Sequence, residues 1–480
     1  MAQRRALPLL LAPVGLGLLA LALIAVGPRQ GAATVHAYEA AAAVIGAVVV
    51  GVLAFAARPS LTLSIGLGLT VFSSHWHTMH MPLPFDRLVI GAGILSLLVR
   101  ERVTVGRDAL RTRPIDWLLM VASVYAVVSA ILAGTIGDSN ARYALLDRFS
   151  LVGFVLFFVA PKAFREERDR RVLLRTLVIV GAYLGVTAFM EKAGLRSLVL
   201  PRYIADPTVG IHFGRARGPF VEAAANGLAL FGCGVAAAMA LTQWKGLKAR
   251  RFAMAVIGFC ALGVFLTETR AAWIAAVAGG VVALLCARQT RRYAIPAALA
   301  VVVGVSGTMA IFPGLHDSVT RRTHDQRPVW DRENSDAAAL RMIAAKPVLG
   351  FGWGRFATDS PDYYRQAFSY PLTGVRNIHN VYLGNFVELG LLGGFLWLFA
   401  CIAAIGGAMF RRGPPELHVW RIGLIGVAIS YAVVGMTTPL GYPFSALLVW
   451  TWAGIVWGER SLVRSARPAV ARPAVAQPAS

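Results

Sequence analysis

The stretch KPVLGFGWGRF (346–356), followed after a polar interval by RNIHNVYLGNFVELGLLGG (376–394), decides how this chain is arranged. A polar segment rich in glycine and tryptophan here runs directly into an apolar segment long enough to form a helix. At the join lies His379, with three polar neighbours, Arg376, Asn377 and Asn380. A titratable side chain at the point where a long loop enters an apolar helix is a plausible place for chemistry. We therefore interpret the rest of the chain as a scaffold that holds this segment at a membrane surface.

The composition is that of a membrane protein. Of the 480 residues, 57% are hydrophobic and only 15% are charged, and the mean hydropathy is +0.63. A soluble protein carries about 25% charged residues. Apolar runs of about 18 to 22 residues recur along the chain, each long enough to cross roughly 30 Å of hydrocarbon. The sequence therefore predicts an all-α, polytopic transmembrane helical bundle of about 12–14 spans, with one long structured external loop.

The apolar runs predict fourteen spans, of which the third and fourth are short. They are, by residue number, 6–26, 37–57, 60–74, 86–99, 116–136, 143–160, 172–190, 223–242, 252–267, 271–287, 293–312, 380–410, 419–437 and 443–458. Clusters of basic residues occupy every second connection between them. This alternation indicates an even number of spans with both termini in the cytoplasm.

Four segments follow from this topology. Residues 1–312 form transmembrane helices 1–11, residues 313–378 a long external loop, residues 379–463 the C-terminal transmembrane helices, and residues 464–480 a disordered cytoplasmic tail that repeats ARPAV. The 313–378 connection is far longer than an ordinary one, and its aromatic residues argue against disorder. The first apolar run resembles a signal peptide, but we expect it to be retained as a helix.

Charge and cysteine content exclude other classes of protein. The net charge is +23, yet the basic residues are spread over many short connections, which argues against a nucleic-acid partner. The four cysteines lie inside apolar runs without CxxC spacing, so metal binding and disulfides are not expected there.

Three polar residues lie on the external side by this topology: Arg217 in GRARGPF, Arg270 in TETRAAW, and His379. We expect each to lie at the membrane surface and not in a packed core. External arginine is disfavoured in membrane proteins, so its presence indicates an anionic partner. The alternative is that these arginines contact lipid phosphates, or pair with Glu222 and Glu268. Arginine suits phosphate because its planar fork donates two parallel hydrogen bonds.

The motifs PVLGFGWGRF and IHNVYLGNFVELGLLG resemble the C-terminal signature of the O-antigen ligase and polymerase superfamily. RxRGPF…N (215–226) and TETRAAW (267–273) resemble that family's two upstream arginine motifs. The resemblance covers roughly Arg215 to Gly394, with four separated motifs in the family's order. One departure is Ala225-Asn226, where the family often has Pro-Asn.

The resemblance implies a metal-independent, inverting membrane glycosyltransferase that needs no cofactor and acts at the outer, periplasmic face of the plasma (inner) membrane. Its donor would be a glycan linked to polyprenyl (undecaprenyl) pyrophosphate, and its acceptor a hydroxyl of a glycan or lipid-glycan. By motif, His379 is the catalytic residue, and Arg217 and Arg270 bind the donor pyrophosphate. A polymerase of lipid-linked repeat units is an alternative. A transporter or flippase of the same lipid is another, although we find no internal repeat to support it.

Several other residues are secondary candidates. Arg341, Arg355, Arg376 and Asn380 are possible substrate-binding residues. His75, His77 and His80 could ligate a metal, but we interpret them as part of an interfacial loop and predict no metal site. Asp147 and Arg148, adjacent within one span, are expected to pair with each other.

Overall fold

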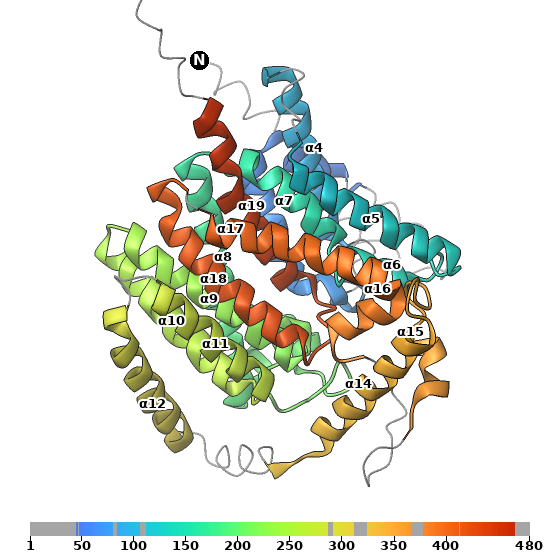
Figure 1. The fold of residues 1–480 in the computed structure, drawn as a ribbon. Helices are drawn as coiled ribbons and strands as arrows, with labels where there is room; N and C mark the ends of the chain where they lie inside the picture. The colour runs from blue at the N-terminus through green and yellow to red at the C-terminus, as the bar shows by residue number, and fades with distance from the viewer. Residues whose placement is uncertain are drawn as a thin grey trace, which may run out of the picture.

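The protein is a bundle of helices (Figure 1). It is described here from a computed structural model, which covers residues 45–46, 48–79, 84–105, 112–286, 291–311, 324–365, 378–411 and 413–465. Within these ranges every regular element is a helix, which confirms the all-α class. The first predicted span, part of the second, and the tail beyond residue 465 lie outside the described residues.

The helices follow one another along the chain, and the connection from α8 to α9 is long and holds three 3₁₀ turns. The long ones, with their bounds, are α3 (Pro59–Leu69), α4 (Phe85–Val105), α5 (Pro114–Leu132), α6 (Ser139–Leu146), α7 (Leu151–Ala163), α8 (Glu167–Lys192), α9 (Ala223–Gln243), α10 (Leu247–Leu266), α11 (Arg270–Cys286), α12 (Ala294–Ile311), α14 (Arg327–Ala345), α16 (Val381–Cys401), α18 (His418–Gly435) and α19 (Pro443–Ser465). The shorter ones are α15 (Phe356–Asp359) and α17 (Gly407–Phe410), with a π-helical turn at Ile402–Gly406 that joins α16 to α17.

Seven helical segments of the described chain are long and apolar enough to cross a membrane. They are Pro114–Leu132, Ser139–Ala163, Glu167–Lys192, Ala223–Gln243, Leu247–Leu266, Val381–Phe410 and Pro415–Gly435. Two shorter apolar helices, Arg270–Cys286 and Pro443–Gly458, accompany them. Many large apolar side chains on their outer faces are exposed, as expected of surfaces that face lipid. The chain is therefore a multi-pass membrane protein.

Small residues let the central helices approach closely. Helix α18 packs along α11, α19 along α7, and α9 lies among α8, α10 and α18. At the α11–α18 crossing, a side chain at Gly279 would strike the backbone of Gly426. This is the packing expected in a bilayer, where close contact and not water exclusion drives helix association.

The long connection predicted between residues 313 and 378 is structured where it is described. Its part from 324 to 365 holds α14, α15 and a 3₁₀ turn at Ser360–Tyr363. Helix α14 packs against α16 (Figure 1). Buried Ala339 and Met342 of α14 share a small core with Phe356, Ile378 and Val387. This core joins the connection to the beginning of α16.

Candidate functional site

Arg217 lies in the loop between α8 and α9, and its side chain is enclosed by that loop. It is 1% exposed. Its guanidinium donates hydrogen bonds to four backbone carbonyls, those of Ile204 (3.0 Å), Asp206 (3.0 Å), Val209 (2.7 Å) and Ile211 (3.4 Å). The Arg217 side chain thereby links the backbone of residues 204–211.

The backbone of the same loop is fixed by two further side chains. The Glu191 carboxylate accepts bonds from the backbone N–H groups of Arg217 (3.2 Å) and Gly218 (2.8 Å). The Asn226 side chain donates to the carbonyl of Ala216 at 3.1 Å. Gly218 has φ +56° and lies directly against the Asn226 amide, so no side chain fits there. These contacts give the RxRGPF…N motif a structural explanation.

The expectation that Arg217 does not lie in a packed core is therefore wrong. Burial lowers the pKa of Arg217, and the Glu191 carboxylate opposes that shift. Neither does Arg217 pair with Glu222, whose carboxylate caps α9 by accepting the N–H groups of Ala224 and Ala225. The sequence could not show this, because the four carbonyls come from an irregular segment with no side-chain pattern.

Arg270, in contrast, is half-buried at the first turn of α11. Its guanidinium donates to the carbonyl of Asp325, just before α14, at 3.1 Å. Glu268, the alternative partner considered from the sequence, forms its ion pair with Lys192. Arg270 therefore stands beside the long connection.

A second cation, Arg332 of α14, lies near Arg270. Burial lowers the pKa of Arg332, and the neighbouring charge of Arg270 lowers it further. Its Nε donates to the carbonyl of Thr437, just past the end of α18, at 3.1 Å. Sequence reasoning missed Arg332; the available signal was its spacing of one helical turn from Asp336, which puts both on one face of a helix.

Asp336 connects α14 to the beginning of α16. Burial raises the pKa of Asp336, and a hydrogen bond from the Asn380 side chain opposes the shift. The Asn380 side-chain oxygen also accepts the N–H groups of Tyr382 (3.1 Å) and Leu383 (3.2 Å), so Asn380 is the N-cap of α16. Asn380, a possible substrate-binding residue by sequence, thus holds two helices together.

His379 is half-buried and lies between two residues anchored on α14. Ile378 before it packs against Ala339 and Met342, and Asn380 after it contacts Asp336. The position of His379 is consequently set by α14 as much as by α16. Through α14, the structure brings Arg270, Arg332 and His379 into one region. The guanidinium of Arg217 is enclosed by its own loop, which adjoins that region through the bond from the Ala216 N–H to the Leu266 carbonyl.

The remaining substrate-binding candidates lie within the long connection. Arg341 donates to the carbonyl of Tyr363 at 2.9 Å, and Arg355 pairs with Asp359 at 2.8 Å. Arg376 lies outside the described residues.

The glycine-rich signature PVLGFGWG supplies hydrogen-bond partners to the backbone at a break in α16. Gly390 has φ 68° and interrupts the helix. The backbone N–H of Phe351 in the loop donates to the carbonyl of Val387 (3.0 Å). The carbonyl of Pro347 accepts a bond from the backbone N–H of Leu391 (2.7 Å). Gly350 lies against the backbone of Gly390, so neither position has room for a side chain. Backbone groups freed within a membrane span must find such partners.

The structure also shows the partners of Asp147 and Arg148 and the surroundings of the histidines His75 and His77. Asp147 and Arg148 do not pair with each other: Asp147 pairs with Arg87, and Arg148 with Glu388. The segment from His75 to His77 packs on the Arg217 loop, where His75 stacks on Tyr203 with ring centroids 4.9 Å apart. Among the described residues no cluster of three potential metal ligands occurs, and His80 lies outside them.

In a comparison with known proteins, a family model matches part of the chain. Residues 252–398 match the family model described as O-antigen ligase, which includes Arg270, Arg332 and His379. This match supports the resemblance for three of its four motifs; the RxRGPF…N motif (215–226) lies outside the matched residues. The matched part of the chain is therefore similar to O-antigen ligases. No curated protein matches the chain.

Proposed function

We propose that the protein is a glycosyltransferase. It moves a glycan from polyprenyl (undecaprenyl) pyrophosphate to an acceptor hydroxyl at the outer face of the plasma membrane, without a metal ion and with inversion. The observation that carries this proposal is the α14–α16 junction. There α14 carries the cation Arg332 and, one turn later, Asp336. The Asp336 carboxylate contacts Asn380, the residue that follows His379.

In this mechanism His379 acts as the general base. Its imidazole takes the proton of the acceptor hydroxyl while that oxygen attacks the anomeric carbon. The bond from the anomeric carbon to the phosphate oxygen breaks, and the electron pair leaves with the pyrophosphate. Attack opposite to the leaving group inverts the anomeric centre.

Arg270 and Arg332 stabilise the charge on the departing pyrophosphate. They come from separate elements, and each makes contacts to backbone carbonyls that still leave N–H groups for a ligand. Two guanidinium groups aimed at one pyrophosphate provide the electrostatic stabilisation that usually contributes most to such reactions.

Arg217 receives a structural role in this proposal, in place of the phosphate-binding role that its motif implies. Both of its terminal nitrogens are engaged with carbonyls, so binding a phosphate would require the loop to open. Arg217 instead fixes the loop that leads into α9.

The decisive experiment incubates purified protein with a polyprenyl-pyrophosphate glycan and candidate acceptors, and identifies the products by mass. Glycan attached to the acceptor, with release of polyprenyl pyrophosphate, supports the proposal. A longer lipid-linked glycan identifies a polymerase. Movement of intact donor across a liposome membrane without any transfer would refute the enzyme and support a transporter.

A further inference from the structure

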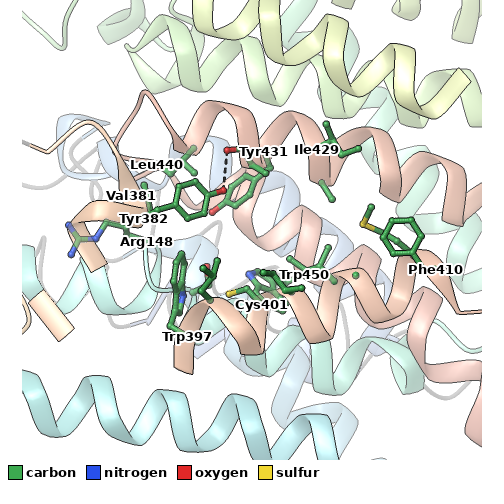
Figure 2. A pocket seen from close by; sticks show the side chains of 18 residues that line it. Arg148, Val381, Tyr382, Trp397, Cys401, Phe410, Ile429, Tyr431, Leu440 and Trp450 are labelled. Carbon is green, nitrogen blue, oxygen red and sulfur yellow. Dashed lines mark hydrogen bonds between the residues drawn. The ribbon is translucent and has the colours of Figure 1, made fainter. Parts of the chain in front are cut away.

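An apolar pocket of about 260 Å³ lies between the α16–α17 segment and α18 (Figure 2). Val381 and Tyr382 at the start of α16 line one end, and residues from Trp397 to Phe410, after the Gly390 break, line the rest of this wall. Two candidate membrane spans, Val381–Phe410 and Pro415–Gly435, supply most of its wall. The pocket therefore lies among segments that cross the bilayer.

A π-helical turn follows α16 beside the pocket. Residues Ile402–Gly406 form a π-helical turn, and Ile402, Ile405 and Gly406 all line the pocket. Opposite them α18 presents the small side chains of Ala428 and Ala432. A π turn within an α-helix is rare and is frequent at functional sites.

The wall offers little to a polar ligand. The Tyr382 hydroxyl donates to the carbonyl of Ala432 at 3.0 Å, as the dashed line in Figure 2 shows. The Ser150 hydroxyl donates to the carbonyl of Asp147 at 3.3 Å. Arg148, at the Tyr382 end, is neutralised by its ion pair with Glu388. An apolar ligand fits such a lining, because a polar one would lose its hydrogen bonds to water without replacement.

The pocket opens to the outside of the bundle. Ile402 and Phe410 line it and are 61% and 76% exposed. Since these residues belong to a candidate membrane span, the opening faces the lipid. A chain could therefore enter sideways from the bilayer.

One end of the pocket adjoins the candidate catalytic region. Val381 and Tyr382, which line that end, directly follow His379 and Asn380. Ala432, which accepts the Tyr382 bond, lies shortly before Thr437, whose carbonyl accepts the bond from Arg332. A cation thus stands beyond one end of an apolar pocket, which complements a molecule with an anionic head and an apolar chain.

We propose that this pocket holds the isoprenoid chain of the lipid-linked substrate, with the first isoprene units at Tyr382 and the pyrophosphate at Arg332 and Arg270. The inference rests on the proposed function for the identity of the lipid. It assigns the chain of that lipid to a defined place, and it excludes a bilayer phospholipid as the principal occupant.

A matched pair of glycine substitutions tests the pocket. A side chain at Gly406 would meet only Ile402, 3.9 Å away, and would project where the pocket lies; Gly280 in α11 also has open space and is not part of the pocket. Gly406→Leu should lower kcat/KM at least about tenfold for a donor with an undecaprenyl chain, because the far end of the pocket is filled. With a donor that carries the same glycan on a geranyl chain, Gly406→Leu should have the same kcat/KM as the unaltered protein. Gly280→Leu should leave kcat/KM unchanged for both donors. Equal losses for both donors, or no loss with the long donor, would overturn the assignment.

A second measurement does not depend on catalysis. A polyprenyl pyrophosphate with a photoreactive group on its chain should label peptides from residues 397–410 in the full-length protein in detergent. Excess polyprenyl pyrophosphate should prevent the labelling, and excess phospholipid should not. Equal protection by phospholipid would show an ordinary lipid site and refute the proposal. Specific labelling without any glycan transfer would preserve the pocket and refute the glycosyltransferase.

Discussion

Two regions of the molecule, each built around an arginine, differ in what that arginine touches. In the Arg217 loop (residues 201–226) the guanidinium is buried and surrounded by carbonyls of its own loop. At the α14–α16 junction (residues 324–336 and 378–382, with Arg270), cations from two elements lie near each other, and α14, which carries one of them, also contacts both neighbours of His379. The sequence motifs present the two arginines as a pair. The difference teaches that a motif marks which arginines matter, and only the surroundings say whether they hold the fold or a ligand.

The largest expected effect lies at the junction. His379→Ala should lower turnover roughly 10²- to 10⁴-fold, because the acceptor loses its general base. The donor should still bind, since the arginines remain. Turnover and donor affinity, measured on the purified variant, check this. Full activity, or unfolding of the variant, would identify His379 as a structural residue and remove it from the mechanism.

The next effect concerns the two cations of the junction. Arg270→Lys and Arg332→Lys should each weaken donor binding and lower kcat/KM by about 10- to 100-fold, because a single ammonium cannot reproduce the bidentate fork. Their melting temperatures should stay near that of the unaltered protein. Arg171→Lys is the matched control, because Arg171 is an exposed residue of α8 in an ion pair with Glu167. Unchanged kinetics for Arg332→Lys would remove that residue from the site.

The Arg217 loop should show the opposite pattern. Arg217→Lys should lower the free energy of unfolding by about 3 kcal/mol, since buried carbonyls lose their donors and each costs about 1–3 kcal/mol. The affinity of the folded fraction for donor should stay the same. Thermal unfolding in detergent measures the effect on stability, and donor titration measures the effect on affinity. Arg202→Lys is the control, because Arg202 is an exposed residue of the same loop. Normal stability combined with weak donor binding would return Arg217 to the phosphate site.

The smallest effect is a dependence on pH at His75, in the segment that packs on the Arg217 loop. Burial lowers the pKa of His75 below its usual 6.5, and the charges of His77 and Arg217 lower it further. The unfolded chain therefore takes up a proton that the folded one refuses, and stability should fall as the pH drops below about 6.5. His75→Gln should make the melting temperature less dependent on pH between 7.5 and 5.5. An unchanged dependence would show that other groups cause it.

The all-α membrane class could be predicted from hydropathy because it depends on local composition alone. The same holds for the beginning of α16, expected at residue 380 and found at Val381. Side-chain pairing could not be predicted in this way. Asp147 and Arg148 are adjacent in sequence, yet their partners come from α4 and α16. The two residues lie in the turn between α6 and α7, and the sequence does not say which side chains lie opposite a turn.

The role of the signature PVLGFGWG is the clearest case of a correct motif with an incomplete interpretation. Its glycines mark an important place, but their partner is a helix break about forty residues later. A bond between two backbones leaves no trace in side-chain chemistry beyond the glycines themselves. Arg332 was missed for a related reason: it is one of many charged residues in α14, and only its contact with the end of α18 distinguishes it.

The break at Gly390 also determines how deep the chemistry lies. The helix that follows it, from Leu391 to Phe410, already has about twenty residues, or roughly 30 Å, which suffices to cross the hydrocarbon. The half-helix before the break, Val381–Leu389, is not needed for crossing and is free to lie in the headgroup layer. The bonds from the 347–352 loop fix its angle there. The position of His379 relative to the Leu391–Phe410 helix is therefore set by a backbone joint.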